Sequence, residues 1–467
     1  MKVLLINPPV ENMIPANTPP IVDEEQGFFP PLGLMYIASY AEKHTQCRLE
    51  ILDTQVEKSG YGDIKREIEK RKPDVVGITA TTFNLVDALL VAKTVKEVCG
   101  AKTIIGGPHA STYPEETLGL GGVDFLVLGE GEITFTELLL NMDSENKLND
   151  INGLAFRGKN GIVITKQRGL IDVLDELPFP ARHLTPYKKY RSLLSKSTIT
   201  AMLTSRGCPH GCIFCNRPHL GKKFRARSAN NVVDEMEECT EMGIHEIAVY
   251  DDTFTLDSKR VLEICDEMVG RGLDITWDIR ARVSDVDKEM LVRLKKAGCG
   301  RIHYGVESGN QDVLDVLRKG TTLDGTRKAF KITKEAGIKT LAYFMIGNPR
   351  EGVGQIKDTL NFINEIKPDY LHLSVTTPFP ATELYEMGLN EKLFEDYWRG
   401  FAKAPTRNFV PNVWEENLSR EELFKMMNDA YRSFYTRPGY VVRKIAEVRS
   451  PGEFRRKAAA FFKLIAK

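Results

Sequence analysis

The first 140 residues alternate between short apolar runs and longer amphipathic stretches. The runs are rich in Val, Ile and Leu, end in polar or glycine residues, and span 2–7, 48–53, 74–80, 101–107 and 123–129. Amphipathic segments such as 85–100 lie between them. Continuous apolar strands that alternate with helices are typical of a parallel sheet covered on both faces. We therefore predict an α/β, doubly wound (Rossmann-like) domain over residues 1–140.

The rhythm breaks over residues 141–197 and then resumes. The broken part predicts a hairpin that turns at 158–161, followed by a proline-punctuated linker at 175–184. Six further strands are predicted at 198–205, 246–252, 274–279, 301–307, 339–347 and 370–375. Helical patterns between them predict a partial (β/α)6 barrel over 198–380. Residues 381–467 predict a mostly helical region that closes the substrate site, with a basic amphipathic helix in the tail from 443 to 467.

The carboxyl ends of the strands in the first domain carry small and polar residues. Parallel open sheets bind ligands at these ends, so we expect a ligand here. A nicotinamide is disfavoured, because no G-x-G-x-x-G motif follows the first strand. The candidate ligand-binding residues are Asn7, Pro8, Pro9, Asp53, Thr79, Thr81, Thr82, Gly106, Gly107, His109, Gly129, Glu130 and Gly131.

Composition limits the class of protein and its partners. The 467 residues are 42% hydrophobic, and 64 Lys and Arg balance 64 Asp and Glu. A balanced charge argues against nucleic acid as a partner. No apolar run approaches the roughly 18 residues that span a bilayer, and the opening apolar run is too short for a signal peptide. We expect a cytoplasmic protein, with the basic tail as a possible peripheral membrane contact.

Three of the eight cysteines form a C-x3-C-x2-C loop directly after the first predicted barrel strand. They are Cys208, Cys212 and Cys215. Three thiolates can hold three corners of a four-iron cluster and leave the fourth iron open. Alternatively, His219 could complete a Cys3His zinc site. The spacing alone leaves iron and zinc open, and the position at the end of a barrel strand favours iron.

The segment "CPHGCIFC" resembles the signature loop of the radical S-adenosylmethionine (SAM) superfamily. The resemblance implies that the three cysteines bind a [4Fe-4S] cluster and that SAM occupies the fourth iron. It also implies a SAM site in which Phe214 contacts the adenine, carboxylates bind the methionine amine, and an arginine binds the methionine carboxylate, with Arg280 favoured over Arg282. The motif "YGVESGN" is implied to bind the ribose. The glycine and glutamate of "MIGNPREG" are implied to complete the site. The implied residues are Phe214, Asp251, Asp252, Arg280, Glu307, Ser308, Gly347 and Glu351.

The first domain adds a second resemblance. "NPP", "PPLGLMYIASY", "GGPHAS" and "GEGE" resemble motifs of the cobalamin-binding radical SAM class, so the strand-end loops are expected to bind cobalamin. The chain contains no D-x-H motif, so no histidine lower ligand to cobalt is expected. His109 is the only histidine in these loops, and we expect that it is not an axial ligand.

The resemblance implies a methyltransferase that methylates an unactivated carbon through a 5′-deoxyadenosyl radical and methylcobalamin. The alternative is a cyclase or another carbon–carbon bond-forming enzyme that acts on a porphyrin or lipid without methyl transfer. A methylthiotransferase and a cobalamin sensor are disfavoured. A peptide or protein substrate is favoured over a lipid or small molecule, and an external low-potential electron donor is expected.

Overall fold

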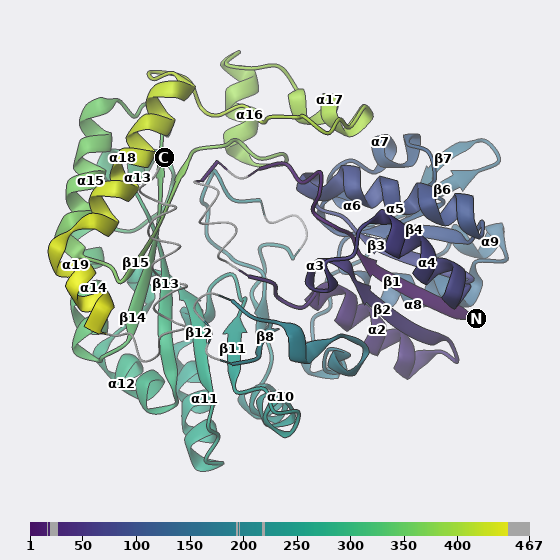
Figure 1. The fold of residues 1–467 in the computed structure, drawn as a ribbon, viewed down its shortest axis with the longest axis horizontal. Helices are drawn as coiled ribbons and strands as arrows, with labels where there is room; N and C mark the ends of the chain where they lie inside the picture. The colour runs from purple at the N-terminus through teal and green to yellow at the C-terminus, as the bar shows by residue number, and fades with distance from the viewer. Residues whose placement is uncertain (16, 19–26, 193–194, 196, 217–219, 447–467) are drawn as a thin grey trace.

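The computed structural model describes residues 1–15, 17–18, 27–192, 195, 197–216 and 220–446. Two α/β halves stand side by side, one a sheet with helices on both faces and the other a curved sheet with helices on its outer face (Figure 1). The predicted α/β class is confirmed for both halves.

The first sheet has the strand order β2-β1-β3-β4-β5-β6-β7. Its parallel strands are β1 (Lys2–Asn7), β2 (Arg48–Asp53), β3 (Val75–Thr79), β4 (Lys102–Gly106) and β5 (Phe125–Val127). In this flavodoxin-like order the connections reverse direction between β1 and β3, and the crevice for a ligand opens at that point. The loops that begin at Asn7 and Thr79 therefore flank the predicted ligand site.

Helices bury both faces of this sheet. In β1, Val3 and Leu5 belong to one core, while Leu4 and Ile6 belong to the other. The first core is covered by α2 (Leu32–His44) and α8 (Gly131–Asn141), and the second by helices that include α4 (Tyr61–Arg71) and α5 (Leu85–Val98). A strand that is buried on both faces needs apolar residues at successive positions, which explains the continuous apolar runs.

The predicted hairpin is present as β6 (Leu154–Gly158) and β7 (Gly161–Ile164). However, it belongs to the first sheet, because β6 pairs antiparallel with β5 and aligns Phe156 with Phe125. The first domain therefore extends beyond the predicted boundary at residue 140. The physical reason is that β5 would otherwise present an unpaired strand edge.

The second half contains six parallel strands that lie next to one another in chain order. They match the six predicted strands: β8 (Ile199–Met202), β11 (Glu246–Val249), β12 (Thr276–Ala281), β13 (Cys299–Glu307), β14 (Lys339–Ile346) and β15 (Tyr370–Val375). The helices on the outer face are α10 (Ala229–Glu241), α11 (Ser258–Gly270), α12 (Lys288–Lys296), α14 (Leu323–Glu335) and α15 (Val353–Ile366) (Figure 1). The partial barrel is confirmed.

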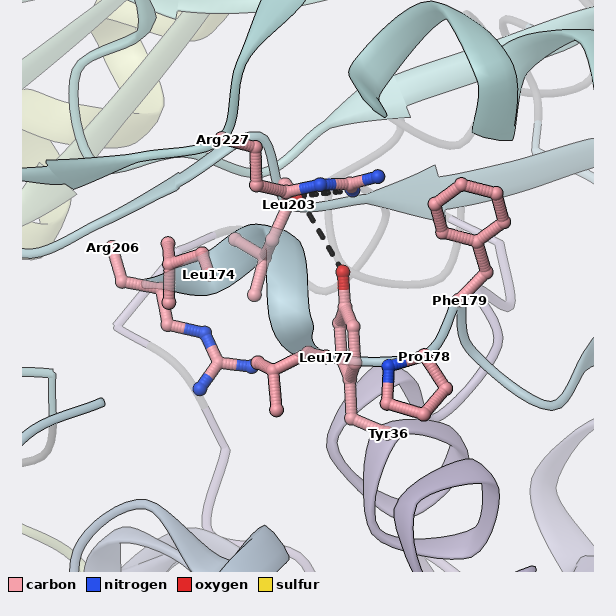
Figure 2. A pocket seen from close by; sticks show the side chains of 8 residues that line it. All are labelled: Tyr36, Leu174, Leu177, Pro178, Phe179, Leu203, Arg206 and Arg227. Atoms are coloured by element: carbon pink, nitrogen blue, oxygen red, sulfur yellow. Dashed lines mark hydrogen bonds between the residues drawn. The ribbon is translucent and has the colours of Figure 1, made fainter. Parts of the chain in front are cut away.

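The proline-rich linker anchors the barrel to the first domain. Arg182 is 1% exposed, and its guanidinium pairs with Glu235 of α10 at 2.5 Å and donates to the carbonyl of Ala201 at 3.0 Å. Figure 2 shows a small pocket where Leu174 and the linker residues Leu177, Pro178 and Phe179 meet Tyr36 of α2 and barrel residues such as Arg227. The Tyr36 hydroxyl donates to the carbonyl of Leu203, and burial raises the pKa of Tyr36 to about 12. The linker is thus a packed part of the interface between the domains.

The C-terminal region is helical, as predicted, up to the end of the described residues. Its helices are α16 (Glu383–Asn390), α17 (Tyr397–Lys403), α18 (Arg420–Thr436) and α19 (Pro438–Ala446). Helix α18 packs against β15, and the Tyr431 hydroxyl accepts from the backbone N–H of Leu373 at 2.8 Å. Helix α17 reaches the first domain, where Arg399 pairs with Glu116 at 3.0 Å (Figure 1). In the described part of the chain, no helix is long and apolar enough to cross a membrane, and the predicted basic tail lies mostly outside it.

Candidate functional site

The cysteine loop lies between two short antiparallel strands, β9 (Ser205–Arg206) and β10 (Arg225–Ala226). It starts at Gly207, whose φ of +86° favours glycine, and a Cβ there would lie 2.3 Å from the carbonyl oxygen of Lys223. The backbone N–H of Ile213 donates to the carbonyl of Leu317 at 3.2 Å. The backbone N–H of Cys208 donates to the carbonyl of Gly221 at 3.3 Å, so the loop is held at its start by its own returning segment and at its middle by the backbone of Leu317.

The three thiols differ in exposure and surroundings. Cys212 is buried, Cys208 is half-buried and Cys215 is exposed. The Arg282 guanidinium lies 3.8 Å from Cys212 Sγ, and the Thr253 hydroxyl lies 3.8 Å from Cys208 Sγ. Donors next to the sulfurs suit thiolates that bind a cluster, because hydrogen bonds to sulfur and local charge tune iron–sulfur sites. The donor set fits a [4Fe-4S] cluster bound by three cysteines.

A mononuclear metal site fits this loop less well. In the part of the chain that the structure describes, no three His, Cys, Asp or Glu side chains are arranged to hold a single metal ion. A cubane cluster offers each thiolate its own iron, so the thiolates do not need to converge on one point. The fourth ligand of the zinc alternative, His219, lies outside the described residues.

The predicted adenine and ribose contacts share a lysine that the sequence reading missed. Lys319 is 7% exposed, and its ammonium pairs with Glu307 at 2.8 Å and lies 5.9 Å from the centre of the Phe214 ring. Glu307 ends β13 with a φ of +72°, which is strained for a residue other than glycine. Strained backbone of this kind gathers at functional sites. Phe214, Glu307 and Lys319 thus form one cluster beside the cysteine loop.

The two carboxylates predicted to hold the SAM amine have different environments. Asp251 is fully buried and accepts from the backbone N–H of Thr204 at 2.6 Å, from the hydroxyl of Ser205 at 2.6 Å and from the hydroxyl of Thr204 at 2.5 Å. These bonds explain Asp251 as a link between the residues that follow β11 and the start of β9 (Ser205–Arg206). Asp252 is exposed, so the geometry favours Asp252 for the SAM amine. Both contacts remain predictions.

Arg280 faces the inside of the barrel. Its neighbours Ile279 and Ala281 belong to the core under the outer helices, so the alternation of a strand turns Arg280 to the opposite face. The guanidinium stacks 3.8 Å from the centre of the Tyr250 ring and donates to the carbonyl of Val249 at 3.2 Å. This position is compatible with the predicted contact to a carboxylate. In contrast, Arg282 is 7% exposed and lies against the cysteine loop.

Further polar side chains line the inner face of β12, β13, β14 and β15. Arg301 Nε donates to His303 Nε2 at 3.1 Å, and His303 Nδ1 lies 3.1 Å from the hydroxyl of Tyr343. Burial and the neighbouring Arg301 hold the pKa of His303 well below its usual value, and burial lowers the pKa of His372 to about 4. Both imidazoles are therefore neutral at physiological pH. The inner face is polar and aromatic, with ion pairing between Arg301 and Asp278.

The remaining SAM-motif residues have clear structural contacts. Ser308 is buried and its hydroxyl lies 3.1 Å from that of Thr359. A Cβ at Gly347, whose φ is +74°, would lie 2.8 Å from Leu423 of α18, so packing explains the glycine. Glu351 accepts from the backbone N–H of Asn348 at 2.9 Å, as expected of a residue that caps this motif. Whether these residues contact SAM remains a prediction.

The predicted cobalamin residues divide into two groups. Those at least partly exposed at the strand ends, and thus accessible to a ligand, are Thr79, Thr81, Gly106, Gly107, Gly129 and Gly131. Those buried in the protein are Asn7, Pro8, Pro9, Asp53, Thr82, His109 and Glu130. Gly107 shows why a small residue is needed, because with its φ of +104° a Cβ would lie 2.7 Å from the carbonyl of Ala80. The glycine at 107 is therefore required by the close approach of the Ala80 backbone, and the accessible strand-end residues leave room for a ligand beside it.

His109 lies in the interior of the first domain. It is 0% exposed, its Nδ1 lies 3.0 Å from the Thr82 hydroxyl, and burial lowers its pKa to about 4. These contacts explain His109 as a neutral core residue. Its Nε2 has no hydrogen-bond partner among the described residues, and the expectation that His109 is not an axial ligand to cobalt stays a prediction.

Two acidic residues at the strand ends connect the domains. Glu130 is 6% exposed and pairs with Arg206 at 2.9 Å and with Arg225 at 2.8 Å, and these arginines belong to the strands on either side of the cysteine loop. Asp53 accepts from the hydroxyl of Tyr190 at 2.8 Å and from the side-chain amide of Asn7 at 2.8 Å. Glu130 therefore joins the predicted cobalamin edge directly to the base of the cysteine loop.

Comparison with known proteins gives matches to both halves. Residues 202–363 match the radical SAM superfamily, and residues 19–139 match the B12 binding domain. The chain is 34% identical over 453 residues to the "Uncharacterized methyltransferase PH0819" of Pyrococcus horikoshii, and the match covers 96% of this chain and 95% of the relative. It is 28% identical to the anaerobic magnesium-protoporphyrin IX monomethyl ester cyclase of Rubrivivax gelatinosus, over 90% of this chain and 76% of that protein.

Two solved structures share the fold. The cobalamin-dependent SAM radical enzyme OxsB, with aqua-cobalamin and SAM bound, superposes with a TM-score of 0.75 at 17% identity, over 99% of this chain and 71% of OxsB. The radical SAM methyltransferase TsrM of Kitasatospora setae, with cobalamin and a [4Fe-4S] cluster bound, gives a TM-score of 0.67 at 19% identity, over 84% of this chain and 75% of TsrM. At these identities the likeness shows a shared fold for both halves of the chain.

Proposed function

We propose methylation at an unactivated carbon as the reaction of this chain, which belongs to the cobalamin-binding radical SAM family. When bound, the cluster supplies the electron that cleaves SAM, and cobalamin supplies a carrier for the methyl group. One substrate C–H bond, two SAM molecules and two electrons would give the C-methylated product, methionine, 5′-deoxyadenosine and S-adenosylhomocysteine. The charge balances, because the two electrons neutralise the two positive sulfonium charges of the SAM molecules and the sulfur atoms of both products are neutral. The electrons require an external low-potential donor.

The observation that carries this proposal is the ion pairing of Glu130 with Arg206 and Arg225. Glu130 follows the last parallel strand of the cobalamin-binding half, and Arg206 lies two residues before Cys208. The pairing holds the cysteine loop at the carboxyl edge of the first sheet, so one substrate can lie between the two cofactor sites. Proximity of this kind is what methyl transfer to a short-lived substrate radical requires.

In this proposal, different residues of the chain bind the cluster, SAM and cobalamin. The cysteine loop would hold the cluster, while Phe214, Glu307 and Arg280 would orient SAM by its adenine, ribose and carboxylate. The accessible strand-end residues, such as the half-buried Gly107, would let cobalamin approach the backbone. The buried interface around Glu130 would exclude water from the path between the cofactors.

We further propose that the substrate is a peptide or protein residue. The inner face of the barrel carries neutral His303, neutral His372, and Tyr343, with Arg280 beside Tyr250. Such a surface can pair with amide and carboxyl groups, whereas a polycyclic lipid would bring only apolar surface against these polar side chains. This favours a polar substrate over a polycyclic lipid.

Labelled SAM tests both proposals. The holoenzyme, reduced anaerobically, would receive SAM with a deuterated methyl group and a lysate from a strain that lacks this gene. We expect 5′-deoxyadenosine and S-adenosylhomocysteine together, with deuterium in tryptic peptides, and no label with a Cys212→Ala variant. Label in the lipid fraction would refute the peptide substrate. If 5′-deoxyadenosine forms without S-adenosylhomocysteine, the enzyme is a cyclase-type member, a reaction that the relative in Rubrivivax gelatinosus makes the second candidate.

A further inference from the structure

Arg282 follows β12 and turns towards the cysteine loop. Its Nη1 lies 3.8 Å from Cys212 Sγ, and its Nη2 donates to the carbonyl of Lys319. The side chain is buried, and its Nε has no hydrogen-bond partner in the described protein. We propose that Arg282 is a positioning residue that holds the Cys212 thiolate and raises the reduction potential of the cluster that the three cysteines bind.

The guanidinium is fixed by a segment that also fixes the loop. In residues 317–320, the carbonyl of Leu317 accepts from Ile213 in the cysteine loop, and the carbonyl of Lys319 accepts from Arg282. Gly320 completes this segment with a φ of +64°, and a Cβ there would lie 3.6 Å from Arg282 Nη2. One short segment therefore sets the position of the arginine relative to the sulfur.

The charges around Arg282 explain why an anion is needed beside it. Among the described residues, no carboxylate forms an ion pair with Arg282, and the nearby carboxylate of Glu307 pairs with Lys319. Asp285 touches Arg282 through its backbone, and the Asp285 side chain accepts from Ser284. Two buried cations thus lie at the loop, and the one carboxylate that pairs with either of them is bound to Lys319. A buried charge without a partner is costly, so the site favours an anion at Cys212.

The redox consequence follows from Coulomb's law. Reduction adds one negative charge to the cluster, and a neighbouring buried cation stabilises the more negative state. Loss of the guanidinium should therefore lower the reduction potential. Lysine at this position keeps the charge but loses the planar fork that reaches both the sulfur and the carbonyl of Lys319.

The test uses the full-length holoenzyme, reconstituted with iron and sulfide and titrated potentiometrically by electron paramagnetic resonance without substrate. For Arg282→Gln with full iron content, we expect the equilibrium constant for reduction to fall at least tenfold, which is about 59 mV for a one-electron couple. Arg282→Lys should lower the reduction potential by less than Arg282→Gln does. Arg293→Gln, which changes a partly exposed arginine on α12, should match wild type. An unchanged potential in Arg282→Gln would overturn the proposal.

A second variant covers the case in which Arg282→Gln does not retain the cluster. Lys319→Met removes the neighbouring cation and keeps the backbone carbonyl that anchors Arg282. We expect full iron content and a reduction potential below that of wild type. If Lys319→Met has the wild-type potential, charge at this site does not tune the cluster and the proposal fails. Because no substrate is present, the result is independent of whether the enzyme methylates or cyclises.

Discussion

Glu351 gives a sharp test of the electrostatics in the motif after β14. It is 2% exposed, and its Oε2 accepts from the backbone N–H and the side-chain amide of Asn348. Its Oε1 has no hydrogen-bond partner in the described protein. Burial raises the pKa of this carboxyl to about 7. The change Glu351→Gln replaces a titrating group by a neutral one of the same shape.

The magnitude follows from linkage. The Glu351 carboxyl holds its proton more tightly in the folded chain than in the unfolded chain, where its pKa is 4.5. The protonated Glu351 carboxyl therefore contributes to the free energy of unfolding. This contribution is fully present below about pH 4.5 and is lost as the pH rises towards 7. At about 1.36 kcal/mol for each pKa unit, the free energy of unfolding of wild type should fall by about 3 kcal/mol relative to the variant over this range.

Urea unfolding from pH 4.5 to 8.5, followed by circular dichroism, would measure the difference between the two proteins. We expect the stability of Glu351→Gln relative to wild type to rise with pH and to level off above pH 7. The matched control is Glu391→Gln at an exposed position, which should follow wild type throughout. A difference between Glu351→Gln and wild type that does not change with pH would refute the reasoning.

Three further changes test the site. Gly207→Ala should prevent cluster binding, because its Cβ would lie 2.3 Å from the carbonyl of Lys223, and wild-type iron content would contradict this. Glu130→Gln leaves the buried guanidinium of Arg225 without its carboxylate and should cost about 3–5 kcal/mol in urea unfolding, whereas a loss below about 1 kcal/mol would argue against a structural ion pair. Cys208→Ala should abolish the iron–sulfur absorbance while circular dichroism stays unchanged, and retained absorbance would mean that another ligand holds the cluster.

Local patterns were sufficient to predict the elements and the cysteine loop. The predicted strands match all five parallel strands of the first sheet and all six of the barrel. In the first sheet a strand between two helical layers must be apolar along its length, whereas β12 and β14 of the barrel alternate between the core under the outer helices and the polar inner face. Cys208, Cys212 and Cys215 lie within one short loop, so the three sulfur donors could be predicted from their spacing in the sequence without knowledge of the fold.

Only the tertiary structure could assign the partners of the charged residues. Glu130 looked like a ligand-binding residue, but it pairs with two arginines that strand order brings to it from the other domain. Arg280 was favoured over Arg282 and Lys319 carried no motif, yet Arg282 and Lys319 both lie at the cysteine loop. The reason is that periodicity reports whether a position is buried, whereas the partner of a buried charge depends on which strand ends meet in space.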